Sequence, residues 1–159
     1  MAATYNNLYL DARKRLREAG VEGAQLEARE LVCCAAGKSR EQFYRDMALY
    51  ASDPVEEKLA ELLERRLAGE PVAYLIGEWE FYGLGLDITP DVLIPRMDTE
   101  VLAERAILLA RAAGEGARVL DLCAGSGCVG LAVAANVPGC RGVLADVSEA
   151  ALRLCKQNV

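Results

Sequence analysis

The segment Arg118-Val-Leu-Asp-Leu-Cys-Ala-Gly-Ser-Gly127, with Gly142-Val-Leu-Ala-Asp146 after it, decides the fold of this chain. Its apolar run at 119–122 is typical of a buried parallel strand, which the following glycines end. Small apolar residues at 129–135 suit a helix packed on a sheet, and the run 143–145 predicts a second strand. The segment therefore predicts one β-α-β unit, with a glycine turn after the first strand and a carboxylate after the second.

The glycine turn and the distant carboxylate together predict a binding site for a nucleoside. Glycine lets the backbone approach a ligand that a Cβ would keep away, and the free N–H groups of the following helix point into the same space. Asp146, nineteen residues after Gly127, is placed to accept two hydrogen bonds from a ribose diol. Hydrogen bonds to a charged group contribute about 1.5–3 kcal/mol each. We therefore expect a ligand of the adenosine type.

The residues around the turn distinguish between nucleoside ligands. Gly125, Gly127 and Gly130 match the G-x-G-x-x-G pattern of dinucleotide sites, which is a weak signal by itself. Asp121, four residues before Gly125, would repel an anionic pyrophosphate but tolerate a ligand with an ammonium and a sulfonium group. D-x-x-x-G-x-G with an acidic strand end resembles the first two motifs of S-adenosylmethionine-dependent methyltransferases. The alternative is a β-α-β unit whose glycines serve only packing.

Composition limits the class of protein further. The chain has 159 residues, a net charge of −6 at pH 7, six cysteines and no histidine. Since no two cysteines form a C-x-x-C pair and no histidine is present, we expect no metal site. Several cysteines lie in apolar stretches, where cysteine behaves as a small hydrophobic residue, so we expect a reducing, cytoplasmic location. No run approaches the ~20 apolar residues of a membrane span, and no basic stripe favours nucleic acid. We therefore expect neither membrane binding nor direct nucleic-acid binding.

The first 69 residues predict a bundle of four helices, which we expect to dock the substrate. Ser39 and Gln42 have the spacing of a capping box for the third helix. From 72 to 95 the pattern changes to a period of two with glycines among aromatic residues, which predicts a β-hairpin. The expected domains are a helical domain over 1–70, a hairpin linker over 71–97 and the start of an α/β cofactor domain over 98–159.

The stretch between the predicted hairpin and the cofactor domain contains one unexplained residue. Asp98 or Thr99 is expected to cap the helix that runs to residue 114. Capping does not explain Arg96, which follows a proline just before the helix. Arg96 has three possible partners: the carboxylate of Asp98, that of Glu100, or a ligand.

Three strings then carry a resemblance to a known family: Gly69-Glu-Pro-Val-Ala-Tyr-Leu-Ile-Gly77, Glu80-Phe-Tyr-Gly83 and Val92-Leu-Ile-Pro-Arg-Met-Asp-Thr-Glu100. They resemble the PrmC/HemK family of protein-(glutamine-N5) methyltransferases, the release factor glutamine methyltransferases. Leu120-Asp-Leu-Cys-Ala-Gly-Ser-Gly127 and Ala145-Asp-Val-Ser148 are similar to the family's cofactor motifs. The resemblance covers essentially the whole chain, although Met97 stands where the family usually has a second proline.

The resemblance implies an α/β fold, with an N-terminal helical bundle and a hairpin linker before a truncated Rossmann-like S-adenosylmethionine-dependent methyltransferase domain. It implies methylation of the glutamine amide in the Gly-Gly-Gln motif of class 1 peptide chain release factors, a step linked to translation termination. Asp121 would meet the cofactor ammonium directly, meet it through water, or only order the turn. The cofactor residues implied are Asp121, Cys123, Ala124, Gly125, Ser126, Gly127 and Asp146.

The family's Asn-Pro-Pro-Tyr motif does not occur in these 159 residues, so the resemblance implies no catalytic residue before Val159. We expect the chain to be the N-terminal part of a longer enzyme and to be inactive by itself. The alternatives are a nucleic-acid N-methyltransferase, a nicotinamide-dependent oxidoreductase, and a non-enzymatic module that binds a release factor. The acidic charge and the Ile-Pro-Arg-Met-Asp-Thr-Glu string disfavour the first, and Asp121 disfavours the second.

Overall fold

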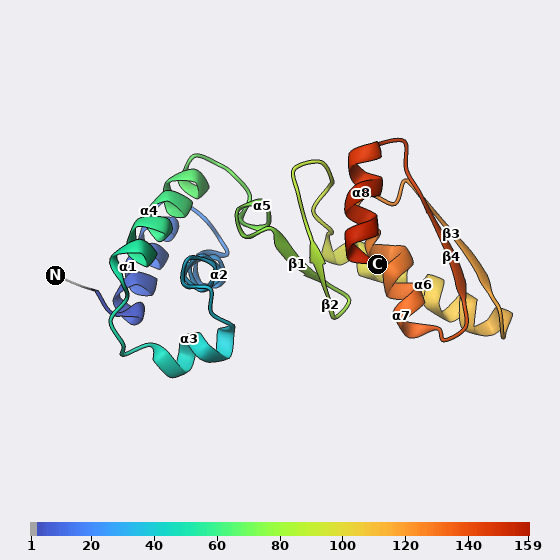
Figure 1. Cartoon of the computed structure of the whole chain (residues 1–159), viewed down its shortest axis with the longest axis horizontal. Helices are drawn as coiled ribbons and strands as arrows, with labels where there is room; N and C mark the ends of the chain where they lie inside the picture. Colours follow the sequence, from blue (N-terminus) through green and yellow to red (C-terminus); the bar gives the residue numbers. More distant parts are fainter. Residues whose placement is uncertain (1–2) are drawn as a thin grey trace. The chain divides into compact units, whose positions relative to one another are not determined.

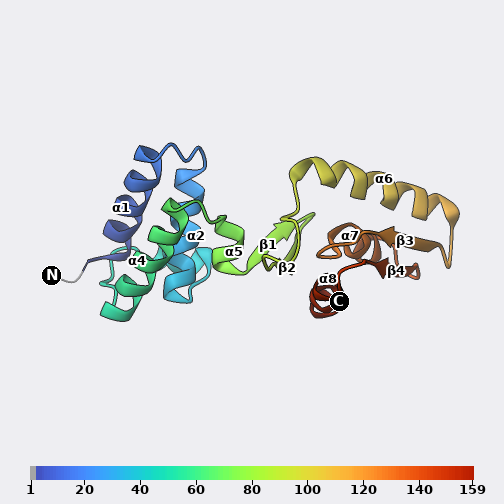
Figure 2. The same ribbon diagram turned by 90° about the horizontal axis from the view of Figure 1, so that it is seen from above.

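The computed structural model describes residues 3–159 and divides into two compact units, one ending at Ile76 and one running from Gly77 to Val159. Figure 1 and Figure 2 show the elements of both units. Within the described range, no helix combines the length and apolar character needed to cross a lipid bilayer. The three-part division into residues 1–70, 71–97 and 98–159 stays a prediction.

The first unit is helical. The four expected helices are present and a short fifth one follows them. The fully buried side chains of the first three helices include Leu16, Leu31, Val32 and Phe43. The helices are α1 (Tyr5–Glu18), α2 (Ala24–Ala36), α3 (Arg40–Asp46), α4 (Asp53–Leu67) and α5 (Val72–Ile76).

The capping box of the third helix is confirmed. The Ser39 side chain accepts a hydrogen bond from the Gln42 N–H at 3.2 Å, and the Gln42 side chain accepts one from the Ser39 N–H at 2.9 Å. Both orphan N–H groups at this helix start are thereby satisfied. Local sequence was sufficient to place this boundary.

The predicted hairpin segment begins too early in the sequence, because residues 72–76 form α5 and not a strand. The Pro71 carbonyl accepts hydrogen bonds from Tyr74 N at 3.0 Å and Leu75 N at 3.2 Å, which closes a helical turn directly after the proline. Val72, Ala73 and Leu75 are buried, and α5 packs on α2 and α4. The prediction of extended backbone here was wrong because tertiary burial of one helical face outweighs the short apolar run.

The second unit is mixed α/β. It opens with an antiparallel pair and continues with a parallel pair separated by a helix. Together with the helical first unit, this confirms the expected fold class. The elements are β1 (Glu78–Phe81), β2 (Leu84–Asp87), α6 (Met97–Ala113), β3 (Arg118–Leu122), α7 (Cys128–Asn136), β4 (Arg141–Ala145) and α8 (Glu149–Asn158).

The hairpin β1–β2 closes through a two-residue turn. Phe81 pairs with Leu84, and the intervening Tyr82 and Gly83 have φ values of 51° and 76°. Positive φ at both central positions is the requirement of a type I′ turn. A tyrosine in this region is uncommon. The Tyr82 N–H donates to Glu100 Oε1 at 2.9 Å, so α6 holds the turn in place.

The predicted cap of α6 was wrong. The helix begins at Met97, its N-cap is Arg96 with extended backbone, and no side chain caps it. Asp98 and Thr99 therefore lie inside the first turn, where Thr99 N donates to the Arg96 carbonyl at 2.9 Å. Asp98 still stabilises the helix start because a carboxylate there faces the positive end of the helix dipole.

The predicted β-α-β unit is confirmed. β3 and β4 pair in parallel, from Arg118 opposite Arg141 to Leu122 opposite Ala145. Helix α7 packs against both strands and against α6, around a core that includes Ile107 and Val133. In Figure 1, α7 and α8 lie to one side of the strand pair. Parallel sheets are usually covered on both faces, yet Leu122 is 70% exposed on the other face.

Candidate functional site

The carboxyl ends of two neighbouring parallel strands form the candidate site. β3 ends at Leu122, which pairs with Ala145 at the end of β4. The loop 123–127 follows β3, and Asp146 follows β4 directly. The register therefore brings the glycine loop and the carboxylate to one edge of the sheet, where open α/β folds bind their ligands.

The loop is held in an uncommon backbone conformation. Cys123, Gly125 and Gly127 all have positive φ, at 62°, 56° and 83°. Glycine adopts such angles without strain, whereas a cysteine does so at some cost. Ala124 N donates to the Ala145 carbonyl at 3.0 Å, and Gly127 N donates to the Ala124 carbonyl at 2.7 Å. These bonds anchor the loop to β4 and turn the chain into α7.

Asp146 bonds to the backbone on both sides of the site. Its Oδ2 accepts from Gly125 N at 2.9 Å, and its Oδ1 accepts from Ser148 N at 2.9 Å. The N–H groups of Ser148 and Gly125 lower the pKa of this carboxyl below its ordinary value. A carboxylate offers about four acceptor positions, so these bonds do not exhaust it. The half-buried side chain is thus preorganised to accept two hydroxyl groups.

Asp121 orders the start of α7. Its Oδ2 accepts from Gly130 N at 2.8 Å. Burial raises the pKa of the Asp121 carboxyl, the Gly130 bond opposes that rise, and the negative charge of Asp146 adds to it. The two carboxylates therefore repel each other across the loop. The turn-ordering role is part of the structure, and Oδ1 of Asp121 remains an acceptor for a ligand.

Two of the three fingerprint glycines, Gly125 and Gly130, serve different purposes. A Cβ at Gly125 would meet nothing within 4 Å, so this glycine leaves open space beside the loop. A Cβ at Gly130 would lie 2.2 Å from Leu144 Cδ2 and 3.1 Å from Asp121 Oδ2. Gly130 is therefore required for close contact between α7 and the strands, while Gly125 leaves room for a ligand.

The other expected site residues divide by exposure. Cys123 is exposed beside the loop, whereas the side chains of Ala124 and Ser126 are buried. Ser126 is only 2% exposed. A ligand on the open side would meet the Cys123 side chain and the loop backbone, but not the Ser126 side chain.

Helix α8 supplies contacts that sequence reasoning missed. The Cys155 thiol donates to the Gly125 carbonyl at 3.1 Å, and Asn158 Nδ2 donates to the Ser126 carbonyl at 3.0 Å. The Ser148 hydroxyl caps this helix by accepting from Ala151 N at 3.2 Å. The capping serine was visible in the sequence. The contacts of Cys155 and Asn158 depend on how α8 packs and had no local signal.

Arg96 and Glu100 have different surroundings. Glu100 bonds to the hairpin turn through Tyr82 N. Arg96 is exposed, and within residues 3–159 it forms no ion pair with Asp98 or Glu100. A contact between Arg96 and a ligand stays a prediction. No group of three or more metal-ligating side chains is present in this part of the chain.

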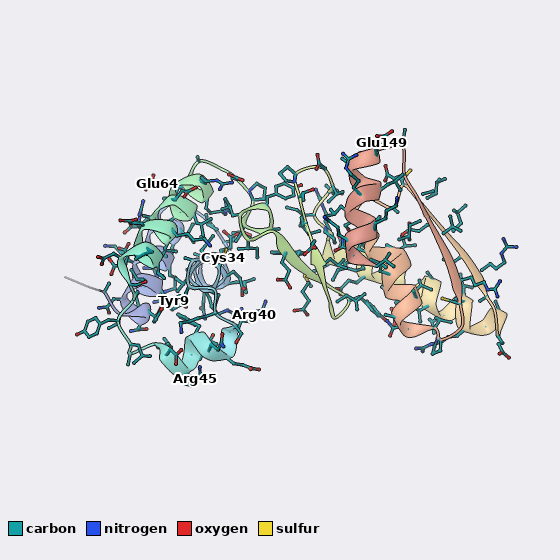
Figure 3. The ribbon with its side chains drawn as sticks, in the orientation of Figure 1. Tyr9, Cys34, Arg40, Arg45, Glu64 and Glu149 are labelled. Atoms are coloured by element: carbon teal, nitrogen blue, oxygen red, sulfur yellow. The ribbon has the colours of Figure 1, made fainter. Side chains whose placement is uncertain are left out.

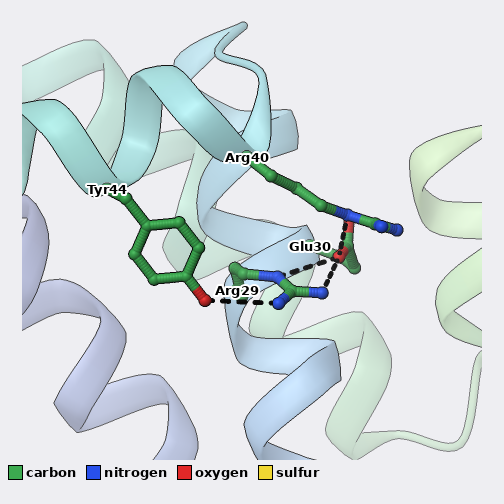
Figure 4. A network of polar contacts seen from close by, with 4 residues as sticks. All are labelled: Arg29, Glu30, Arg40 and Tyr44. Carbon is green, nitrogen blue, oxygen red and sulfur yellow. Dashed lines mark hydrogen bonds and ion pairs between the residues drawn. The ribbon is translucent and has the colours of Figure 1, made fainter.

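In the first unit, charged side chains connect the helices. Glu30 Oε1 on α2 accepts from Arg29 at 2.8 Å and from Arg40 of α3 at 3.0 Å, while Arg29 Nη1 donates to the Tyr44 hydroxyl at 3.3 Å (Figure 4). Arg40 lies on α3 together with Arg45 (Figure 3). This network fixes α3 on α2 and leaves Tyr44 56% exposed.

Each of the two units matches a known protein family. The family described as the PrmC N-terminal domain matches residues 7–77. The family described as the methyltransferase small domain matches residues 85–159. The two matches together cover nearly all of the chain, and the first one ends close to the division between the two compact units.

Whole-protein relatives agree with the domain matches. The release factor glutamine methyltransferase of Coxiella burnetii is 40% identical over 134 residues, covering 84% of this chain and 48% of the relative. That of Bordetella pertussis is 44% identical over 140 residues, covering 84% and 49%. That of Vibrio cholerae is 35% identical over 158 residues, covering 99% and 54%. The chain thus spans about half the length of the curated relatives it matches.

Proposed function

Because the chain belongs to the release factor glutamine methyltransferase family, we propose that the protein methylates the Gly-Gly-Gln glutamine amide of class 1 peptide chain release factors with S-adenosylmethionine as donor. The residues proposed to hold the donor lie at the carboxyl edge of β3 and β4. They are Asp121, Cys123, Ala124, Gly125, Ser126, Gly127 and Asp146.

The observation that carries this proposal is the pair of carboxylates on either side of a glycine loop. Burial raises the pKa of the Asp121 carboxyl and the negative charge of Asp146 adds to that rise, so the two charges repel in the protein alone. A ligand with a cationic end relieves that repulsion, whereas an anionic pyrophosphate increases it. S-adenosylmethionine carries both an ammonium and a sulfonium group, and a nicotinamide dinucleotide has no comparable cation beside its phosphates. The charge pattern therefore supports a methyl donor over a dinucleotide.

The geometry fits the parts of that donor. Asp146 lies at the end of β4 and is proposed to accept hydrogen bonds from the ribose hydroxyls. Gly125 leaves open space where a side chain would stand. The free Oδ1 of Asp121 is suited to the ammonium group, directly or through water. When bound, the donor supplies an electrophilic methyl group on its sulfonium.

The chemistry explains why a strong base is unnecessary. An amide nitrogen is a poor nucleophile because its lone pair is delocalised into the carbonyl. Rate enhancement then depends on positioning and on hydrogen bonds that orient the amide NH2. We propose that the orienting residues belong to an Asn-Pro-Pro-Tyr motif outside this sequence, so residues 1–159 alone do not complete the transfer.

The first unit is proposed to dock the release factor. It is a separate compact body, matched by the PrmC N-terminal domain, and its side-chain networks fix helices to one another. All six cysteines are free, which supports a reducing, cytoplasmic location. The exposed Tyr44 on α3 is a candidate contact, because tyrosine is enriched in protein interfaces.

The test is transfer of a labelled methyl group by the intact protein. Incubation with methyl-labelled S-adenosylmethionine and a class 1 release factor should label the factor. A release factor whose motif glutamine is replaced by alanine should stay unlabelled, as should duplex DNA. Labelling of DNA but not of the release factor would overturn the proposal in favour of a nucleic-acid methyltransferase. Binding of the factor without any transfer would favour a non-enzymatic docking protein.

A further inference from the structure

One side chain near the end of α8 joins two separate segments of the second unit. Asn158 Oδ1 accepts from Asp87 N at 2.8 Å, and Asn158 Nδ2 donates to the Asp87 carbonyl at 3.1 Å. The same Nδ2 donates to the Ser126 carbonyl at 3.0 Å. The amide thus bonds to both backbone groups of the last residue of β2 and to the middle of the glycine loop.

These contacts are made at a place where the loop needs support. Ser126 lies between Gly125 and Gly127, whose positive φ values require glycine and allow alternative backbone conformations. The Ser126 side chain is buried, so its carbonyl has a fixed direction. One turn earlier on α8, Cys155 binds the neighbouring Gly125 carbonyl. Two consecutive carbonyls of the loop are therefore held by one helix.

Side chains from two helices of the second unit form hydrogen bonds with the two ends of the hairpin. Glu100 of α6 binds the turn through Tyr82 N, and Asn158 of α8 binds the opposite end through Asp87. The contact with Asp87 imitates the pair of bonds that a neighbouring strand would make. The hairpin and the glycine loop consequently share Asn158, and a change in one alters the bonds available to the other.

We propose that Asn158 is a positioning residue for the methyl donor, which couples the glycine loop at 123–127 to the end of the hairpin at Asp87. This inference rests on the proposed function, because the loop is taken as the donor site. Donor binding orders the loop, strengthens the bond from Asn158 to Ser126, and so protects Asp87. Coupling between two sites is reciprocal, so the hairpin contact also strengthens donor binding.

Two substitutions separate the two halves of the coupling. Asn158→Ala removes all three hydrogen bonds. Asn158→Asp keeps an oxygen that can accept from Asp87 N but removes the donor to the Ser126 and Asp87 carbonyls. Gln157→Ala is the matched control, because Gln157 is an exposed neighbour on the same helical turn.

The experiment combines amide hydrogen exchange with donor titration on the intact protein. Without donor, the Asp87 amide should exchange roughly tenfold faster in Asn158→Ala than in the wild type. It should stay protected in Asn158→Asp and in Gln157→Ala. S-adenosylmethionine should bind roughly tenfold more weakly to both Asn158 variants. Donor should slow exchange at Asp87 in the wild type and not in Asn158→Asp, a readout that a purely structural role would not produce.

The outcomes distinguish this inference from the function on which it depends. If the wild type binds no S-adenosylmethionine, the proposed function fails and the positioning role fails with it. If the wild type binds the donor and Asn158→Asp binds it equally well, only the positioning role is overturned. If Asn158→Ala does not fold, as judged by its melting temperature, the Asn158→Asp comparison decides the matter by itself.

Discussion

Replacement of Gly130 by alanine tests how closely α7 must approach the strands that carry the site. The Gly130 backbone does not have positive φ, so an alanine can adopt it. The obstacle is space, because the added Cβ would lie 2.2 Å from Leu144 Cδ2 and 3.2 Å from Asp121 Cβ. Carbon atoms in contact normally stay about 3.5–4.0 Å apart. Either the Leu144 side chain must change its rotamer or helix α7 must move away from the strands.

The expected cost follows from three contributions. Overpacking a core costs about 1–3 kcal/mol. Displacing α7 weakens the charged hydrogen bond from Gly130 N to Asp121 Oδ2, a loss of up to about 1.5 kcal/mol. The better helix propensity of alanine returns up to about 1 kcal/mol. We expect Gly130→Ala to destabilise the second unit by about 2 kcal/mol.

Urea unfolding followed by tryptophan fluorescence measures this change. The single tryptophan, Trp79, lies in β1 and therefore reports on the second unit. The control is Gly142→Ala in β4, where the new Cβ would meet nothing within 4 Å and φ is not positive. The control should alter the free energy of unfolding by less than about 0.5 kcal/mol.

A double variant identifies the source of the cost. Leu144→Ala removes the atom that the new Cβ would strike, so Gly130→Ala should cost less in that background than in the wild type. If Gly130→Ala were as stable as the wild type, or if its cost were unchanged in the Leu144→Ala background, the assignment of Gly130 to close packing would be refuted.

Three further predictions concern the loop and its carboxylate. Iodoacetamide should alkylate the exposed Cys123 before the buried Cys155, whose pKa is raised by burial. S-adenosylmethionine should slow the alkylation of Cys123 but not that of Cys34. If peptide mass spectrometry gave equal alkylation rates for Cys123 with and without S-adenosylmethionine, the assignment of the loop to the donor site would be contradicted. The lowered pKa of Asp146 means that its stabilising contribution is complete above the ordinary aspartate value of about 4 and is lost as pH falls through the lower folded value. The difference in the free energy of unfolding between wild type and Asp146→Asn should therefore become smaller as the pH falls from 5 to 2. A difference in urea midpoints that stays constant over this range would refute the prediction. Residues 1–159 expressed alone should transfer no labelled methyl group to a release factor, and any turnover would disprove this.

Local signals were sufficient for much of the fold. The Ser39–Gln42 capping box, the four helices before residue 69 and the β-α-β unit all depend on spacing within a few residues. Local reasoning was wrong where tertiary contacts decide. Residues 72–76 form a helix because one face is buried against α2 and α4, and α6 begins at Met97 without a side-chain cap.

The candidate site shows the same division. Its position after β3 and β4 was predictable, since the glycine turn and Asp146 mark two strand ends. The bond from Gly125 N to Asp146 was not, because it depends on the register of the two strands. Asn158 gave no signal at all, since its partners lie 71 and 32 residues away in the chain.

Calorimetric titration of the intact protein with S-adenosylmethionine, and separately with NADH, tests the ligand preference that the paired carboxylates imply. We predict saturable heat with S-adenosylmethionine and none with NADH. Saturable heat with NADH, or silence with both ligands, would contradict the account.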